Sequence, residues 1–273
     1  MSILKETYKL NNGVEIPKIG FGTWQIPNKD AFDAVKMAIQ SGYRHIDTAL
    51  AYQNEEGVGK AIRESGIKRE ELFVTSKIPA QIKGYKEAMG AFDQIINNLK
   101  TDYLDLYLIH APWPWDDQGG DYTKQNIETW KAMEYLYKQK KVRAIGVSNF
   151  APGHINSILD NGEIIPAANQ IAFYAGRTQE SIVAYCKDKG ILIEAYSPLA
   201  TGRALLDPLL NDLADKYNVT VAQLLIRFTL QRGTLPLPKT MSKARMTENA
   251  NVNHFVISES DMATMNSIKN EYR

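Results

Sequence analysis

Short apolar runs alternate with longer amphipathic stretches along the chain. One stretch has apolar residues on one face of a helix, at Ala88, Phe92, Ile95 and Leu99. Thr220-x-x-Gln223 is a capping box, which predicts the start of another helix. The runs have the length of buried strands. Eight of them are predicted as strands: Lys18–Gly22, His45–Asp47, Leu72–Ser76, Leu104–His110, Arg143–Ser148, Ala167–Ile171, Ile191–Tyr196 and Thr234–Leu237.

Alternating strands and helices predict parallel strands that are joined by crossover helices. Eight such units in 273 residues fit one closed (β/α)8 TIM barrel, which typically takes about 250 residues. The segment 8–16, with Asn12-Gly13 at a turn, predicts a β-hairpin before the first barrel strand. No linker divides the chain, so we expect a single domain over residues 1–273. A doubly wound sheet is the alternative, but no G-x-G-x-x-G follows the first strand.

The composition limits the classes of binding partner and the compartment that we expect. Thirty-two basic and thirty-one acidic residues give a net charge of +1, which does not favour nucleic acid as a partner. One cysteine, Cys186, excludes an intrachain disulfide and fits a reducing compartment. The first eight residues lack the apolar core of a signal peptide, and no run approaches the roughly 18 apolar residues of a membrane span. We therefore expect a cytoplasmic protein with no membrane partner.

Three ionisable side chains stand at the ends of successive predicted strands: Asp47, Lys77 and His110. Each alone has an ordinary structural interpretation, as a loop cap, a surface lysine or a hydrogen-bonded histidine. In a barrel, however, the active site lies at the carboxyl ends of the strands. The three together predict a site there, and an Asp–Lys pair offsets the cost of burying either charge alone.

The other predicted strand ends carry polar or aromatic residues. Taken singly, these favour loop hydrogen bonds or core packing. They are Thr23-Trp24, Ser148-Asn149, Gln170, Tyr196-Ser197 and Lys239-Thr240.

Three segments resemble the signatures of the aldo-keto reductase family. They are Gly42–Gly59, Arg143–Phe150 and Leu237–Asn249, and they occur in the family's order. The likeness extends from the hairpin to the eighth unit. It is greatest to the short bacterial type, similar to 2,5-diketo-D-gluconate reductase and prostaglandin F synthase.

The resemblance implies a catalytic tetrad of Asp47, Tyr52, Lys77 and His110, with NADPH and a small carbonyl compound as ligands. Reducing a carbonyl needs a proton donor as well as a hydride, and a free phenol is a weak acid at neutral pH. We expect Lys77 to lower the pKa of Tyr52 and Asp47 to hold Lys77 charged. His110 is expected to orient the carbonyl oxygen.

The resemblance also implies three groups of cofactor contacts. The nicotinamide end is expected to meet Ser148, Asn149 and Gln170 through its amide and Tyr196 by stacking. The 2′-phosphate is expected at Lys239, Thr240 and Arg245, and the adenine at Glu248 and Asn249. Thr23, Ser197 and Leu199 complete the expected cofactor contacts. No metal site is expected, because the four histidines lack ligand spacing.

The substrate side departs from the family pattern. Ala111 follows His110 where many relatives have Trp, and Trp113 and Trp115 come shortly after. Only Asn270–Arg273 remain beyond the last predicted helix, whereas larger relatives have a longer tail over the barrel mouth. We therefore expect an open pocket and a broad reductase of aldehydes and activated ketones. Its expected walls are Trp24, Tyr52, His110 and Trp113.

Two other functions stay open from the sequence. One is an aldolase-like enzyme in which Lys77 forms a Schiff base with a carbonyl compound. The other is a non-catalytic family member that only binds NADPH. We expect a monomer, with a weak dimer as the alternative.

Overall fold

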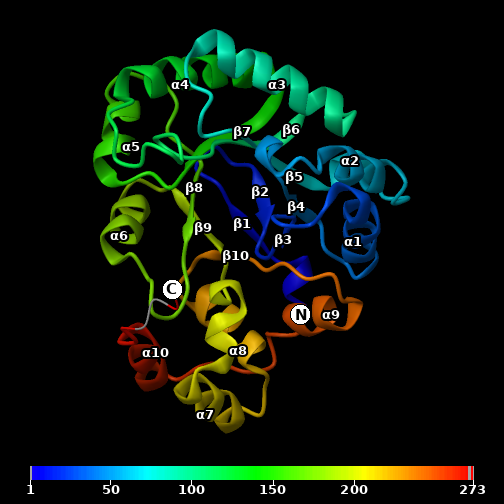
Figure 1. Cartoon of the computed structure of the whole chain (residues 1–273). Coiled ribbons are helices and arrows are strands. Elements are labelled where there is room, and N and C mark those ends of the chain that lie inside the picture. The colour runs from blue at the N-terminus through cyan, green and yellow to red at the C-terminus, as the bar shows by residue number, and fades with distance from the viewer. Residues whose placement is uncertain (1, 270–271, 273) are drawn as a thin grey trace.

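The computed structural model describes residues 2–269 and 272. Parallel strands form one sheet in the order β10-β9-β8-β7-β6-β5-β4-β3. Its two outer strands are joined, since Gly20 N donates to the Pro236 carbonyl at 3.0 Å and Gly22 N to the Pro238 carbonyl at 3.1 Å. The sheet therefore closes into the predicted barrel (Figure 1). The strands are β3 (Phe21–Gly22), β4 (His45–Asp47), β5 (Phe73–Ile78), β6 (Leu104–Ile109), β7 (Val142–Ser148), β8 (Ala168–Ala172), β9 (Leu192–Tyr196) and β10 (Leu235–Leu237).

All eight predicted strands are confirmed, most of them within two residues at each end. The first differs most, because its regular part begins at Phe21 instead of Lys18. Helices alternate with the strands and surround the barrel (Figure 1). They are α1 (Asn28–Gln40), α2 (Glu55–Arg63), α3 (Tyr85–Leu99), α4 (Thr123–Lys138), α5 (Pro152–Leu159), α6 (Glu180–Asp188), α7 (Pro208–Lys216), α8 (Val221–Gln231), α9 (Lys243–Ala250) and α10 (Glu259–Asn266). The described residues also form the 3-10 turns η1 (Ile3–Lys5), η2 (Leu50–Tyr52), η3 (Arg69–Glu71) and η4 (Ala200–Leu206).

The capping box predicted at Thr220 begins α8. Thr220 Oγ1 accepts from Gln223 N at 3.2 Å, and Gln223 Oε1 accepts from Thr220 N at 3.0 Å. These two bonds satisfy backbone donors that a helix start leaves without partners. The apolar face of α8 then packs on the barrel through Leu224, Leu225 and Phe228.

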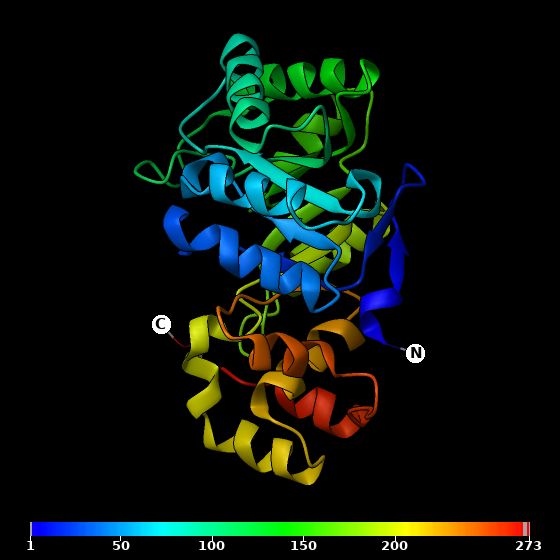
Figure 2. The same ribbon diagram turned by 90° about the vertical axis from the view of Figure 1, so that its right-hand side faces the viewer.

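The predicted hairpin consists of β1 (Thr7–Lys9) and β2 (Glu15–Pro17) in antiparallel pairing. Asn11 Nδ2 donates to the Pro166 carbonyl and Asn12 Nδ2 to the Arg143 carbonyl, both at 2.9 Å. These carbonyls lie where β8 and β7 begin, so the hairpin covers the amino end of the barrel (Figure 2). The carboxyl ends of the strands lie at the opposite, uncovered end of the barrel.

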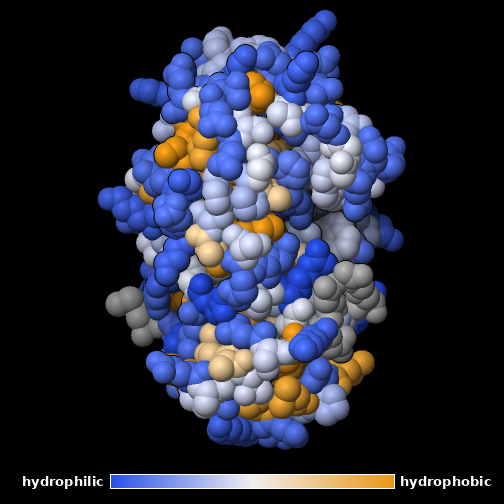
Figure 3. All heavy atoms as spheres, turned by 90° about the vertical axis from the view of Figure 1, so that its left-hand side faces the viewer, coloured by the Kyte–Doolittle hydropathy of each residue, from blue (hydrophilic) through white to orange (hydrophobic). Residues whose placement is uncertain are grey.

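The chain's last described residue is anchored. The Tyr272 hydroxyl donates to Asp207 Oδ2 at 2.8 Å, and Arg203 Nη1 donates to the Tyr272 carbonyl at 2.8 Å. The rest of the segment Asn270–Arg273, which we expected to form a short tail, lies outside the described residues. The face seen in Figure 3 is mostly polar, with small groups of apolar side chains at its upper left and at its lower end. No helix in the described part of the chain has the length and apolar character to cross a membrane.

Candidate active site

Lys77 lies wholly buried on β5, beside β4. Its Nζ donates to Asp47 Oδ1 at 2.9 Å, to Asp47 Oδ2 at 2.8 Å and to the Thr48 carbonyl at 2.8 Å. The Tyr52 hydroxyl, from η2, is 3.4 Å from the same nitrogen. Three of the predicted catalytic side chains therefore meet at one ammonium group.

The protonation states of Lys77 and Tyr52 depend on their burial and on the charges beside them. Burial alone would lower the pKa of Lys77, but Asp47, together with Tyr52 and Glu194, outweighs burial and the pKa lies above its ordinary value. For Tyr52 burial is the largest influence and raises the pKa to about 12, although Lys77 lowers it. Lys77 thus lowers the pKa of Tyr52 as expected, but burial exceeds this effect, and the net pKa lies above its ordinary value. At neutral pH Tyr52 is a protonated phenol beside a cation.

His110 follows β6 directly, and its ring meets Tyr52 edge-on with centroids 5.6 Å apart. Burial, with smaller contributions from Lys77 and Lys83, lowers the pKa of His110 to about 3. The imidazole is therefore neutral at physiological pH. Its Nδ1 is buried with no hydrogen-bond partner among the described residues, so Nε2 is the nitrogen that faces the cavity. A neutral His110 can donate a single N–H to an oxygen placed there.

Asn54 fixes the loop that carries Tyr52, a role our sequence reasoning missed. Its Nδ2 donates to the carbonyls of Thr23 at 2.9 Å and Ile26 at 3.0 Å, and its Oδ1 accepts from Thr48 Oγ1 at 2.8 Å. This amide ties η2 to the loop after β3. Thr23, an expected cofactor contact, instead donates its hydroxyl to the Asp47 carbonyl and does not line the cavity.

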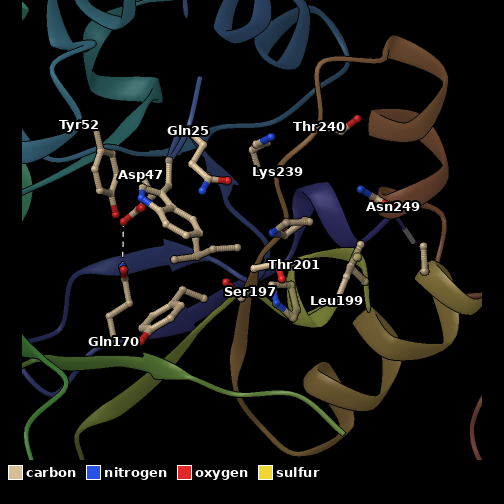
Figure 4. A pocket seen from close by; sticks show the side chains of 18 of the residues that line it. Gln25, Asp47, Tyr52, Gln170, Ser197, Leu199, Thr201, Lys239, Thr240 and Asn249 are labelled. Atoms are coloured by element: carbon tan, nitrogen blue, oxygen red, sulfur yellow. Dashed lines mark hydrogen bonds between the residues drawn. The ribbon is translucent and has the colours of Figure 1, made fainter. Parts of the chain in front are cut away.

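A cavity of about 1060 Å³ opens over the carboxyl ends of the strands. In Figure 4, Tyr52, Asp47 and Gln170 lie on one side of it and Lys239, Thr240 and Asn249 on the other. The predicted residues that line it are Trp24, Asp47, Tyr52, His110, Ser148, Asn149, Gln170, Tyr196, Ser197, Leu199, Lys239, Thr240, Arg245, Glu248 and Asn249. Lining residues that we did not predict include Gln25, Gln81, Trp115, Thr201 and Thr220.

The aromatic wall beside His110 is Trp115, and our assignment of Trp113 to this wall is corrected. The Trp115 ring lies 5.7 Å from the His110 ring, and Trp113 packs edge-on against Trp115 at 5.5 Å. Trp113 is absent from the cavity lining. The two rings stand in an irregular loop that contains Pro112 and Pro114, where strand alternation does not determine which side chain faces inward. The loop's base is held by Lys83, whose Nζ donates to the Ala111 carbonyl.

Two amides close the floor of the cavity. Gln170 Nε2 donates to Asp47 Oδ1 at 2.8 Å and to Glu194 Oε2 at 3.0 Å. Asn149 Nδ2 donates to the His110 carbonyl at 3.1 Å and to Ser148 Oγ at 3.0 Å, while its Oδ1 accepts from the Tyr196 hydroxyl at 2.9 Å. Asn149 thus also ties the end of β7 to His110. Gln170 Oε1 accepts no hydrogen bond from the described residues.

The donors around the cavity fit a phosphorylated dinucleotide. Lys239 and Arg245 are exposed at one end and form no ion pair within the described part of the chain. Arg245 stands in the first turn of α9, where backbone N–H groups also favour an anion. Glu248 is held by Thr220, whose hydroxyl donates to Glu248 Oε1 at 2.8 Å. The cation pair at one end and the amide oxygen of Gln170 at the other match the charge pattern of a nicotinamide dinucleotide phosphate.

Comparison with known proteins decides the family. The model of the "Aldo/keto reductase family" matches residues 18–270. The chain belongs to the aldo/keto reductase family. It is therefore an oxidoreductase of a family whose members use NADP(H), and the resemblance inferred from the three signatures is confirmed.

Individual members of the family are similar over nearly the whole chain. Glyoxal reductase of Bacillus subtilis is 45% identical over 271 residues, 99% of this chain and 95% of that protein. An aldo/keto reductase structure from Brucella melitensis has a TM-score of 0.90 at 39% identity and covers 96% of this chain and 97% of its own. A Bombyx mori aldo-keto reductase in complex with NADP has a TM-score of 0.89 at 36% identity, with 98% and 94% covered.

Proposed function

We propose that this protein is an NADPH-dependent reductase of small aldehydes, activated ketones and dicarbonyl compounds. The reaction is reversible, so the enzyme also oxidises the product alcohols. The observation that carries the proposal is the contact of the Lys77 ammonium with Asp47 and Tyr52, at the floor of a cavity large enough for a dinucleotide. This arrangement supplies a proton donor and a stabilised conjugate base where the carbonyl would lie.

Each catalytic side chain has a distinct part in the reaction. NADPH, when bound, supplies the hydride to the carbonyl carbon. The Tyr52 hydroxyl gives its proton to the carbonyl oxygen, and the phenolate that forms is stabilised by Lys77 at 3.4 Å. Asp47 keeps Lys77 protonated and in place. Neutral His110 donates a hydrogen bond to the same oxygen and orients it.

NADPH is proposed over NADH because of Lys239 and Arg245. Charge-assisted hydrogen bonds to a phosphate contribute about 1.5–3 kcal/mol each at best. Both side chains are exposed, so solvent screening reduces that gain. We expect a preference for NADPH of roughly tenfold or more. The relative solved with NADP supports this choice of cofactor.

Small carbonyl compounds are proposed because the substrate side is aromatic and open. Trp24 is 46% exposed and Trp115 is 38% exposed, so neither encloses a substrate on all sides. Apolar walls of this kind separate close analogues by only about 1–3 kcal/mol. Glyoxal reductase among the relatives supports dicarbonyls within this class.

The Schiff-base alternative receives no support from Lys77. A nucleophilic lysine must be neutral, whereas Asp47 holds the pKa of Lys77 above its ordinary value. Its Nζ also already donates to three oxygens within 2.9 Å.

The deciding experiment follows NADPH consumption with a panel of aldehydes, diketones and keto sugars. Tyr52→Phe should retain NADPH affinity and lose about 10²–10⁴-fold in kcat, because only the proton donor is removed. Tyr107→Phe is the matched control, since Tyr107 is wholly buried against α3 and donates to the Ala88 carbonyl. A Tyr52→Phe enzyme with more than roughly a third of wild-type kcat would contradict the proposal. Absence of turnover with every carbonyl tested would favour a non-catalytic NADPH-binding protein.

A further inference from the structure

Glu194 is a wholly buried carboxyl group inside the barrel that the proposed reaction does not use. It lies on β9 directly opposite Gln170 on β8 in the register of the two strands. It does not line the cavity, so it cannot touch a substrate or cofactor. Any part it plays in the reaction must act through a neighbour, and its hydrogen-bonded neighbour is Gln170.

The Gln170 amide forms hydrogen bonds to two acids on different strands of the barrel. Its Nε2 carries two N–H groups, and both are used, by Asp47 Oδ1 on β4 and by Glu194 Oε2 on β9. The reversed amide would place its oxygen 2.8 Å from the Asp47 carboxylate oxygen, which is repulsive, and would lose the N–H that Glu194 Oε2 accepts at 3.0 Å. The two acids therefore hold both N–H groups of Gln170 and leave its Oε1 without a partner among the described residues; Figure 4 shows the bond to Asp47.

We infer that Glu194 is a positioning residue that, together with Asp47, locks Gln170 as a hydrogen-bond acceptor and thereby selects a cofactor ring bearing an N–H donor. The inference rests on the proposed function, because it assumes that the nicotinamide ring lies beside Gln170. A carboxamide on the ring donates an N–H to Gln170 Oε1, whereas a methyl ketone in the same place presents only an acceptor.

The charges around Glu194 are compatible with this role. Burial is the main cause that raises the pKa of Glu194 to about 8, the nearby Asp47 raises it further, and Gln170 and Lys77 lower it. The acid is therefore protonated at neutral pH. Its Oε1 has no hydrogen-bond partner among the described residues and is the oxygen free to carry the proton. His45 Nε2, 3.8 Å from that oxygen, belongs to a neutral imidazole, and Oε2 remains an acceptor for Gln170.

The test compares the binding of three ligands: NADP⁺, its 3-acetylpyridine analogue, in which a methyl ketone replaces the carboxamide, and 2′,5′-ADP, which has no ring to contact Gln170. Dissociation constants come from calorimetry, so no turnover is needed. We expect wild type to bind NADP⁺ about three- to tenfold more tightly than the analogue, the value of one net hydrogen bond. In Glu194→Met the ratio should fall to about one while 2′,5′-ADP affinity stays unchanged.

Three further variants separate positioning from folding. Glu194→Gln keeps an oxygen that can accept from Gln170 and should restore most of the wild-type ratio. Glu194→Asp withdraws the carboxyl group by one methylene, keeps a polar side chain and should lower the ratio even if Glu194→Met does not fold. Glu55→Met is the matched control, because Glu55 is another buried acid but bonds to Ser76 and Asn98, away from Gln170.

A wild-type ratio in both Glu194→Met and Glu194→Asp overturns the inference, and so does an equal fall in Glu55→Met. A folded Glu194→Met that weakens all three ligands alike also overturns it, because the effect is then general. If wild type binds no NADP⁺, the proposed function fails and the inference fails with it. If wild type reduces carbonyls with NADPH and the Glu194 variants keep the wild-type ratio, only the inference fails.

Discussion

Lys77→Met removes the cation at the centre of the active site and leaves the Asp47 carboxylate buried without its counter-ion. Asp47 is only 4% exposed, and breaking a buried pair from one side typically costs about 3–5 kcal/mol. Gln170 still donates to Asp47 Oδ1 at 2.8 Å, which favours the lower end of that range. We therefore expect a loss of about 3 kcal/mol in the free energy of unfolding, or roughly 6–12 °C in Tm.

Urea unfolding followed by circular dichroism at pH 7 measures this loss. Lys83→Met is the matched control, because Lys83 is partly buried but donates only to neutral oxygens, on Ala111 and Asn126. Removing Lys83 leaves no buried charge without a counter-ion, so we expect the free energy of unfolding to fall by less than about 2 kcal/mol. The double variant Asp47→Leu/Lys77→Met removes both charges and should recover at least half of the loss. A Lys77→Met protein no less stable than Lys83→Met, or a double variant with no recovery, would refute the reasoning.

Three further predictions concern the cofactor, the substrate wall and acid stability. Arg245→Ala should weaken NADPH binding about tenfold and spare NADH, as measured by titration of tryptophan fluorescence; equal losses would mean that Arg245 does not contact the 2′-phosphate. Trp115→Ala should raise KM for aromatic aldehydes more than Trp113→Ala does, because Trp115 lines the cavity, and the reverse order in steady-state kinetics would restore Trp113 to the wall. Burial, aided by Lys77, lowers the pKa of His45 to about 3 from 6.5, so its stabilising contribution is complete above pH 6.5 and is lost as pH falls toward 3. His45→Gln should therefore flatten the decline in unfolding free energy by about 2 kcal/mol between pH 6.5 and 5, and an unchanged slope in urea titrations would contradict this assignment.

The barrel was predictable because its signals are local. A buried strand needs a short apolar run and a helix needs an apolar face, and both can be counted along the chain. The eight apolar runs and their order were sufficient to predict the closed sheet, and the Asn-Gly turn was sufficient to predict the hairpin. The boundaries were less exact, as at β3, where Gly20 already bonds to Pro236 of β10 but the regular strand begins only at Phe21.

The position of the catalytic side chains was also predictable, while their charge state was not. Parity along β4 and β5 placed Asp47 and Lys77 on one side, and the structure joins them at 2.8 Å. The net rise of the Tyr52 pKa to about 12 comes mainly from burial, which depends on how completely the folded chain excludes water and cannot be counted along the sequence.

The sequence by itself therefore determined the barrel, the family and which side chains stand at the strand ends. The periods of strands and helices and the family signatures are local patterns that can be read from the sequence alone. Only the tertiary structure decided that Trp115 instead of Trp113 lines the cavity, that Asn54 ties down the Tyr52 loop, and that Glu194 grips Gln170. The direction of a side chain in an irregular loop depends on what packs around it. The bond between Gln170 and Asp47 joins residues 123 positions apart, a contact that exists only once the barrel has closed.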